Sequence, residues 1–198
     1  MNQQKLWDNI AKEWNEFKKT PSKTVLEFLK KQSGNILDLG SGSGRHLTKI
    51  KNGKMFLVDF SEKMIKKAKN NAKNKKIPAE CKVSELNKIP YPDNFFDSAI
   101  CFDSLHCVET DKQREQTIKE LYRVLKPRAP ALISVWKKDS KRFKNAKKEK
   151  YIGWRDKGKR YYYLYNDKEI HDLFKKSGFK IKEKIPHNIK IEFIIESV

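Results

Sequence analysis

The chain has 198 residues, of which 45 are Lys or Arg and 25 are Asp or Glu, giving a formal charge of +20. Its 37% hydrophobic and 11% aromatic content exclude a disordered polyelectrolyte, and no stretch approaches the roughly 20 apolar residues of a membrane span. The length suits one α/β domain, and the charge suggests a polyanionic partner, although only seven of the basic residues are Arg and a plain lysine-rich surface is the alternative.

The spacing of the cysteines and histidines shows whether a disulfide or metal site is expected, and the first residues show whether a secretory signal is expected. Cys81, Cys101 and Cys107 form no CxxC pair, and the four histidines show no HExxH or HxH spacing. Residues 1–12 contain no apolar run before a small-residue cleavage site, so no secretory signal is predicted. We therefore expect a reduced, cytoplasmic protein with neither a disulfide framework nor a metal site.

The first half of the chain predicts helices followed by alternating strands and helices. Helical spacing of apolar residues indicates a helix over residues 4–17, and Ser22 is expected to cap a second helix that Gly34 ends. These two helices make residues 1–33 an N-terminal extension of a single domain, 1–198. The elements expected next are a strand over 36–39, a glycine-rich turn over 40–44, a short helix through Ile50, a strand over 55–58, a helix after Ser61 and a weak strand over 81–83.

The second half continues the alternation with one interruption. Strands are expected over 98–102 and 131–136, helices over 117–125 and 167–176, and an antiparallel strand pair over 179–185 and 189–195. This pattern is typical of a mainly parallel sheet with helical crossovers. Residues 137–160 interrupt it with 12 Lys or Arg and three acids. We interpret residues 137–165 as a basic, aromatic lid over the carboxyl ends of the strands; a solvated loop is the alternative.

The glycine-rich turn is the sharpest chemical signal in the sequence. Gly40, Gly42 and Gly44 follow a strand directly, where glycine allows a tight turn and close approach of the backbone to a ligand. Asp59 ends the next strand, 19 residues after Gly40, which is where nucleotide-binding folds place an acid for ribose hydroxyls. The spacing is GxGxG, without a following Lys-Ser or Lys-Thr pair, so it favours a ligand with a ribose but no pyrophosphate.

Several motifs together resemble the class I S-adenosylmethionine-dependent methyltransferases, in matching order along nearly the whole chain. They are the segments 38–44, 59–61, 86–91, 96–97 and 125–127. The resemblance implies a Rossmann-like α/β fold with a seven-stranded sheet, an antiparallel last strand and helices on both faces. It also implies S-adenosylmethionine as the cofactor.

The resemblance implies which residues bind this cofactor. The glycine turn would face its methionine and ribose parts, Phe60 would pack on the adenine, and Glu85 with Leu86 would meet the adenine edge. The full set expected to bind the cofactor is Asp38, Gly40, Ser41, Gly42, Gly44, Asp59, Phe60, Ser61, Glu85, Leu86 and Phe102.

Further segments resemble one branch of this family, the tRNA methyltransferases that esterify 5-carboxymethyluridine at the wobble position. These segments are residues 6–14, 104–110, 135–136 and 160–165. Departures occur at Phe17-Lys18, where the branch has Thr-Arg, at Ser22 in place of Trp, and at Tyr163 in place of His. The branch implies tRNA as a partner and a small zinc-binding activator protein that adds a strand beside the third strand.

The expected chemistry is esterification of a carboxylate that is already ionised at pH 7, so positioning is the main catalytic effect and no general base is needed. His106, Arg160 and Lys18 would hold the carboxylate or nearby phosphates. RNA would be bound by Tyr161 and Tyr162, which could stack on an unpaired base, together with Trp136, Trp154 and Arg155.

Blander interpretations of the same residues stay open at this point. The run 161–165 is also typical of a half-buried strand, His106 of a hydrogen-bonded scaffold residue, and Trp136 of a core residue. Cys107 is expected to pack rather than react. The alternative functions are a small-molecule methyltransferase of the same superfamily and a non-catalytic RNA-binding protein on this fold.

Overall fold

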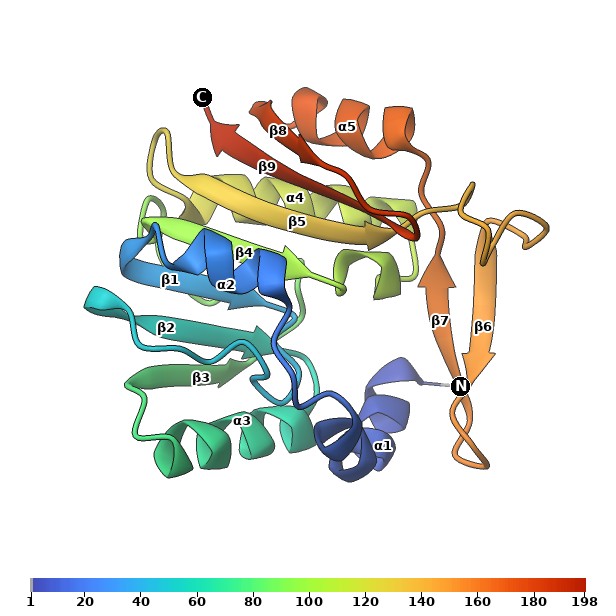
Figure 1. Cartoon of the computed structure of the whole chain (residues 1–198), viewed down its shortest axis with the longest axis horizontal. Helices are drawn as coiled ribbons and strands as arrows, with labels where there is room; N and C mark the ends of the chain where they lie inside the picture. Colours follow the sequence, from blue (N-terminus) through green and yellow to red (C-terminus); the bar gives the residue numbers. More distant parts are fainter. Residues whose placement is uncertain (1) are drawn as a thin grey trace.

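The computed structural model of the chain describes residues 2–198 and contains one large mixed sheet (Figure 1). The sheet has seven strands in the order β3-β2-β1-β4-β5-β9-β8. Its strands are β1 (Ser33–Leu39), β2 (Lys51–Asp59), β3 (Ala79–Val83), β4 (Ser98–Phe102), β5 (Pro130–Trp136), β8 (Phe179–Ile185) and β9 (Lys190–Ser197).

The strand directions follow the pattern that the sequence resemblance implies. Strands β3, β2, β1, β4 and β5 are parallel to their neighbours, β9 is antiparallel to β5, and β8 is antiparallel to β9. The predicted seven-stranded Rossmann-like sheet with an antiparallel last strand is therefore confirmed. Because the order reverses between β1 and β4, both of these strands open at their carboxyl ends onto the crevice where such folds bind ligands.

Helices cover both faces of this sheet. On one face, α2 (Lys23–Leu29) and α3 (Glu62–Asn74) pack on side chains such as Ile36 and Leu57. On the other, residues of α4 (Asp111–Val124) and α5 (Asp167–Lys176) belong to one hydrophobic cluster with Leu37 and Val58. Neighbouring residues of one strand thus serve opposite faces, as the two-residue period of a strand requires. Helix α1 (Gln3–Phe17) packs on α3 at the carboxyl end of the sheet.

Local signals explain where the helices begin. The Ser61 hydroxyl accepts the Met64 N–H at 3.1 Å and caps α3, as predicted. Helix α4 begins at Asp111, earlier than the expected residue 117, because Thr110 and Gln113 form a reciprocal capping box.

Two expectations about turns in the first half are wrong. Gly34 does not end α2; it lies in β1 at a bulge with φ +82°, where a Cβ would collide with the Asp97 carboxylate. No helix follows the glycine-rich turn, because Gly42 and Gly44 have positive φ and the backbone forms only isolated turns there. The backbone N–H groups that could bind a ligand here are therefore those of the glycine-rich turn itself and not those of a helix N-terminus.

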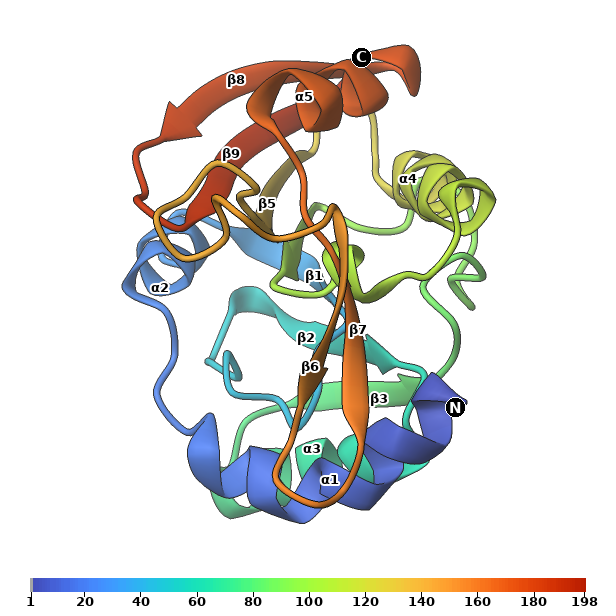
Figure 2. The ribbon, with the colours of Figure 1, turned by 90° about the vertical axis from the view of Figure 1, so that its right-hand side faces the viewer.

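Residues 137–165 contain a second, two-stranded sheet. Strands β6 (Glu149–Gly153) and β7 (Lys159–Tyr163) form an antiparallel hairpin (Figure 2). Hydrogen bonds join its tip to α1, and β7 also packs on the short 3₁₀ helix η1 (Leu105–Cys107). We call residues 137–165, which lie beside the carboxyl ends of the strands, the strap.

Candidate functional site

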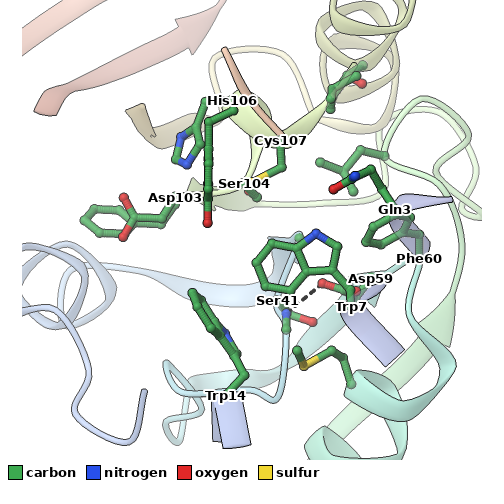
Figure 3. A pocket seen from close by; sticks show the side chains of 18 of the residues that line it. Gln3, Trp7, Trp14, Ser41, Asp59, Phe60, Asp103, Ser104, His106 and Cys107 are labelled. Atoms are coloured by element: carbon green, nitrogen blue, oxygen red, sulfur yellow. Dashed lines mark hydrogen bonds between the residues drawn. The ribbon is translucent and has the colours of Figure 1, made fainter. Parts of the chain in front are cut away.

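A cavity of about 390 Å³ lies at the carboxyl ends of the strands. Its walls come from the glycine turn after β1, from the ends of β2, β4 and β5, and from α1 (Figure 3). The segment 137–165 contributes Arg142 and Tyr162. The elements that meet here are distant in sequence, and the sheet topology brings them together.

Asp59 organises the glycine turn. One carboxylate oxygen accepts the Gly42 N–H at 2.8 Å and the other accepts the Ser61 N–H at 3.0 Å. The turn is also fixed to β2 by the N–H groups of Gly40 and Ser41, which donate to the Val58 carbonyl at 2.8 and 3.0 Å. Burial raises the pKa of Asp59 to about 6, although both N–H bonds favour its ionised form.

Helix α1 is held over this end of the cavity. Asp8 accepts the Ser61 hydroxyl at 2.6 Å and the Lys63 N–H at 3.0 Å, which ties α1 to the start of α3. The Gln4 side-chain amide donates to the Phe60 carbonyl at 2.8 Å. The helix thus shields the Asp59 region from solvent, and Trp7 and Trp14 of α1 line the same cavity.

Two observations indicate that this end fits a nucleoside cofactor. A Cβ added to Gly42 would meet only the Trp14 indole nitrogen, at 3.8 Å, so the turn leaves open space against the cavity. Ser41 and Asn87 line the cavity, and Ser41 Oγ and Asn87 Oδ1 are buried without a hydrogen-bond partner among residues 2–198. Buried polar atoms are normally paired, so these two atoms indicate a polar ligand. With the Asp59 carboxylate beside them, the residues present fit a cofactor that carries ribose hydroxyls.

The opposite end of the cavity is cationic. Asp103 accepts Arg45 Nη2 and Lys190 Nζ, each at 2.9 Å, and these cations hold the Asp103 pKa well below its usual range. Burial lowers the pKa of Lys18, and the positive charge of Arg45 lowers it further. Arg142 also lines the cavity. Four cations therefore accompany two acids at this end, because Glu192 lies 3.8 Å from Lys190 behind Asp103. Asp59, Glu85 and Glu109 lie at the other end.

His106 is buried between these two ends. Its ring stacks on Trp136 at 5.3 Å and lies 5.4 Å from the Tyr162 ring, and its Nδ1 finds no hydrogen-bond partner in the described part of the chain. Burial lowers the pKa of His106 to about 4, so the imidazole is neutral at pH 7. A neutral ring offers one N–H donor and one acceptor to a bound molecule.

Arg160 lies beside the cavity but does not line it. Its guanidinium carbon is 4.9 Å from the Trp154 ring, 5.2 Å from Trp14 and 5.2 Å from Tyr162. The side chain is buried, its Nε has no partner, and among residues 2–198 no acid pairs with it. Aromatic faces stabilise this cation in place of a carboxylate.

The structure brings most of the predicted residues together. Those that line the cavity are Lys18, Gly40, Ser41, Gly42, Asp59, Phe60, Glu85, Leu86, Phe102, His106, Trp136 and Tyr162. Those that do not are Asp38, Gly44, Ser61, Trp154, Arg155, Arg160 and Tyr161. Asp38 is buried behind the turn, where its pKa rises to about 7, and Ser61 is occupied as a helix cap.

The tyrosine run is buried more fully than the half-buried strand of the alternative interpretation. Tyr161 and Tyr162 are each 2% exposed, so neither ring is open to an incoming base in this conformation. The Tyr161 N–H donates to Gln3 of α1 at 3.0 Å, and Tyr162 stacks on Trp136 at 4.4 Å. Tyr163 donates to Glu169 of α5. These rings build the wall between strap and sheet.

Sequence reasoning missed Arg45, Asp103 and Lys190. Arg45 directly follows the glycine turn and Asp103 directly follows β4, so both could have been found from their places at adjacent strand ends. Lys190 begins β9, and only the antiparallel return of the chain brings it to Asp103. Within residues 2–198 no group of three or more His, Cys, Asp or Glu side chains is placed to hold a metal ion. No helix of that range is long and apolar enough to cross a membrane.

The sequence is similar to that of known methyltransferases. A methyltransferase domain model matches residues 37–133. A tRNA (carboxymethyluridine(34)-5-O)-methyltransferase of Arabidopsis thaliana is 35% identical over 103 residues, which are 51% of this chain and 24% of that protein. A Schizosaccharomyces pombe protein of the same name is 26% identical over 209 residues, covering 90% of this chain and 88% of its own.

A solved structure has the same fold. It is a methyltransferase in complex with the Haloferax volcanii Trm112 methyltransferase activator, 16% identical, with a TM-score of 0.74. The match covers 96% of this chain and 97% of that one. The chain spans less than a third of the length of the Arabidopsis relative, whereas it spans most of the fission yeast relative.

Proposed function

Because the chain belongs to the class I S-adenosylmethionine-dependent methyltransferases, we propose that it methylates the carboxylate of 5-carboxymethyluridine at the wobble position of a tRNA. The observation that carries this proposal is the charge separation in the cavity. Asp59, Glu85 and Glu109 lie at the cofactor end. At the other end Lys18 and Arg142 pair with no acid of residues 2–198, and Arg45 and Lys190 share Asp103, with Glu192 near Lys190. An anionic acceptor matches the cationic end, and a neutral or cationic acceptor does not.

The proposed chemistry needs positioning more than proton transfer. When bound, S-adenosylmethionine supplies a sulfonium methyl group, which an ionised carboxylate oxygen accepts without first losing a proton. Lys18 and Arg45 would hold the carboxylate, and the neutral His106 ring would donate one N–H to it. Arg160 would add positive charge from behind the aromatic wall. Trp136 and Tyr162 would exclude water and limit the orientations of the acceptor.

A tRNA acceptor is supported by the surface around the cavity and by the names of the relatives. Residues 137–160 carry 12 Lys or Arg and three acids, and the strap they begin borders the cavity. Phosphate attraction by such a segment is independent of sequence and falls with salt. The two relatives named above act on carboxymethyluridine at position 34.

The test is methyl transfer into defined nucleosides. The full chain is incubated with labelled S-adenosylmethionine and tRNA that carries 5-carboxymethyluridine, and the digested nucleosides are identified by mass spectrometry. We expect the methyl ester of that nucleoside, and no label in matched tRNA with unmodified uridine. Transfer into a small metabolite but into no tRNA preparation would overturn the proposal in favour of a small-molecule methyltransferase. Asp59→Ala serves as the control that cannot bind the cofactor normally.

We also propose a zinc-binding activator protein as a partner at the β3 edge. Strand β3 ends the sheet, is paired with β2 alone among the described residues, and leaves Val83 exposed. An unpaired strand edge can accept a further strand. Co-expression with such a protein should give a 1:1 complex by size-exclusion chromatography, and Cys81→Pro in β3 should abolish it while the isolated chain still binds cofactor.

A further inference from the structure

Phe17 is a large aromatic residue on the surface at the end of α1. Its side chain is 66% exposed, and the other exposed large hydrophobics in residues 2–198 are Val83, Tyr151 and Val198. The Phe17 ring centre lies 5.4 Å from that of Trp154 and 6.2 Å from that of Trp14. The helix end and the strap tip therefore form one aromatic surface, whose outermost ring faces water.

This aromatic surface continues out of the cavity. Trp14 lines the cavity, and Lys18, the residue after Phe17, lines it as well. Lys18 Nζ lies 5.8 Å from the Trp14 ring centre and 5.4 Å from that of Phe17. A molecule whose reacting part occupies the cationic end of the cavity therefore has Phe17 at the rim where the rest of it emerges.

The surroundings of Phe17 favour an anionic partner. Arg155 of the strap is exposed and lies over the Trp154 ring, and Lys18 and Lys19 follow Phe17 directly. Two acids lie within four residues before it in α1. Glu13 is already paired with Lys157 at 2.6 Å and with Arg155 at 3.3 Å, whereas Glu16 is exposed. The unpaired charge around the ring is therefore mainly positive.

We propose that Phe17 is a stacking platform for an unpaired base that flanks the acceptor nucleotide. The inference rests on the proposed RNA substrate and adds to it a binding site outside the cavity. A flat exposed ring surrounded by cations matches the two components of a single strand, because bases stack on aromatic faces while phosphates are attracted to Lys and Arg. Every base has a π-face, so this contact does not read sequence.

The experiment combines a protein change with a change in the RNA. The probe is a fluorescently labelled anticodon stem-loop RNA, bound to the full chain and followed by anisotropy. Phe17→Ala should weaken binding at least about fivefold, because stacking of one base contributes about 1–3 kcal/mol. Removing the base on one side of position 34, as an abasic nucleotide, should weaken wild-type binding by a similar factor. Phe17→Ala should then have no further effect on the abasic RNA.

Matched variants separate stacking from other roles of this surface. Phe17→Trp should retain affinity, whereas Phe17→Leu, which is apolar but not flat, should bind like Phe17→Ala. The thermal midpoint and S-adenosylhomocysteine affinity should stay unchanged, since the ring is largely exposed. An equal loss from Phe17→Ala on intact and on both abasic RNAs would overturn the platform, and so would an altered oligomeric state of the free variant.

The outcome also separates this inference from the proposed function. If wild type methylates modified tRNA and Phe17→Ala binds the stem-loop with wild-type affinity, the platform is wrong and the function stands. If wild type neither binds the stem-loop nor methylates tRNA, both are overturned.

Discussion

The indole N–H of Trp154 donates to Oε2 of Glu13 at 2.8 Å and joins the tip of the strap to the first helix across 141 positions of sequence. The same carboxylate pairs with Lys157 and Arg155. The hydrogen bonds from Lys157 and Trp154 lower the pKa of Glu13, so Glu13 is ionised at neutral pH. Trp154 in turn covers the Arg160 guanidinium, and one acid thus connects helix, strap and the buried cation beside the cavity.

Removing this acid should loosen the tip of the strap. Glu13→Ala should accelerate tryptic cleavage after Arg155 and Lys157 severalfold, because local opening exposes these sites. Glu13→Gln keeps an acceptor for Trp154 and should have a smaller effect. Limited proteolysis followed by mass spectrometry measures both. Glu16→Ala, at an exposed position of the same helix, is the control. Equally faster cleavage in that variant would contradict a specific role of Glu13 in fixing the strap tip.

Two glycines of the same turn should respond differently to alanine. At Gly42 a methyl group meets only Trp14, at 3.8 Å, so Gly42→Ala should cost about 1 kcal/mol for its left-handed backbone and mainly obstruct the cofactor. At Gly40 a Cβ would lie 2.2 Å from Ser104 Cβ, and Gly40→Ala should cost about 3 kcal/mol. Urea unfolding and isothermal titration with cofactor measure the two effects. Normal cofactor affinity in Gly42→Ala would contradict the placement of the site.

The parts of the site that sequence could predict lie where a strand ends. Gly40 and Asp59 follow apolar strand residues, and parallel strands place their carboxyl ends at one edge, so the sequence pattern alone brings these two residues together. The pattern does not bring Asp103 to Lys190, since their contact depends on how β9 returns antiparallel to β5. Sequence likewise shows a basic aromatic segment at 137–165 but not that Glu13 fixes it.

Cofactor binding should weaken in acid because of Asp59. Its pKa is raised to about 6 by burial, and ribose hydroxyls are expected to donate to the ionised form. Below pH 6 a proton must leave before the cofactor binds, so affinity should be about tenfold lower at pH 5 than at pH 7. Isothermal titration across this range tests it. Asp59→Asn should bind the cofactor weakly at every pH. If the affinity of this variant fell with pH as steeply as that of wild type, the titrating group would be another residue, such as Asp38.

Replacing Asp103 should reveal how the cationic end is stabilised. Asp103→Asn keeps the size of the side chain and tolerates its φ of +60°, so the change removes only the charge between Arg45 and Lys190. Arg45 would lose its acidic partner, and Lys190 would keep only Glu192, at 3.8 Å. The change should cost about 3 kcal/mol at pH 7, measured by urea unfolding. Asp93→Asn, which removes an exposed partner of Arg123, should cost less than about 1 kcal/mol.

The stabilisation that Asp103 provides should be lost in acid. The pKa of Asp103 is lowered in the folded chain, so its stabilisation is complete above the unfolded pKa of about 4 and is lost as pH falls toward the folded value. The stability difference between wild type and Asp103→Asn should therefore be constant from pH 5 to 8 and shrink below pH 4. A difference that persists unchanged at pH 3 would mean that the Asp103 carboxylate stabilises the fold by hydrogen bonds and not by its charge.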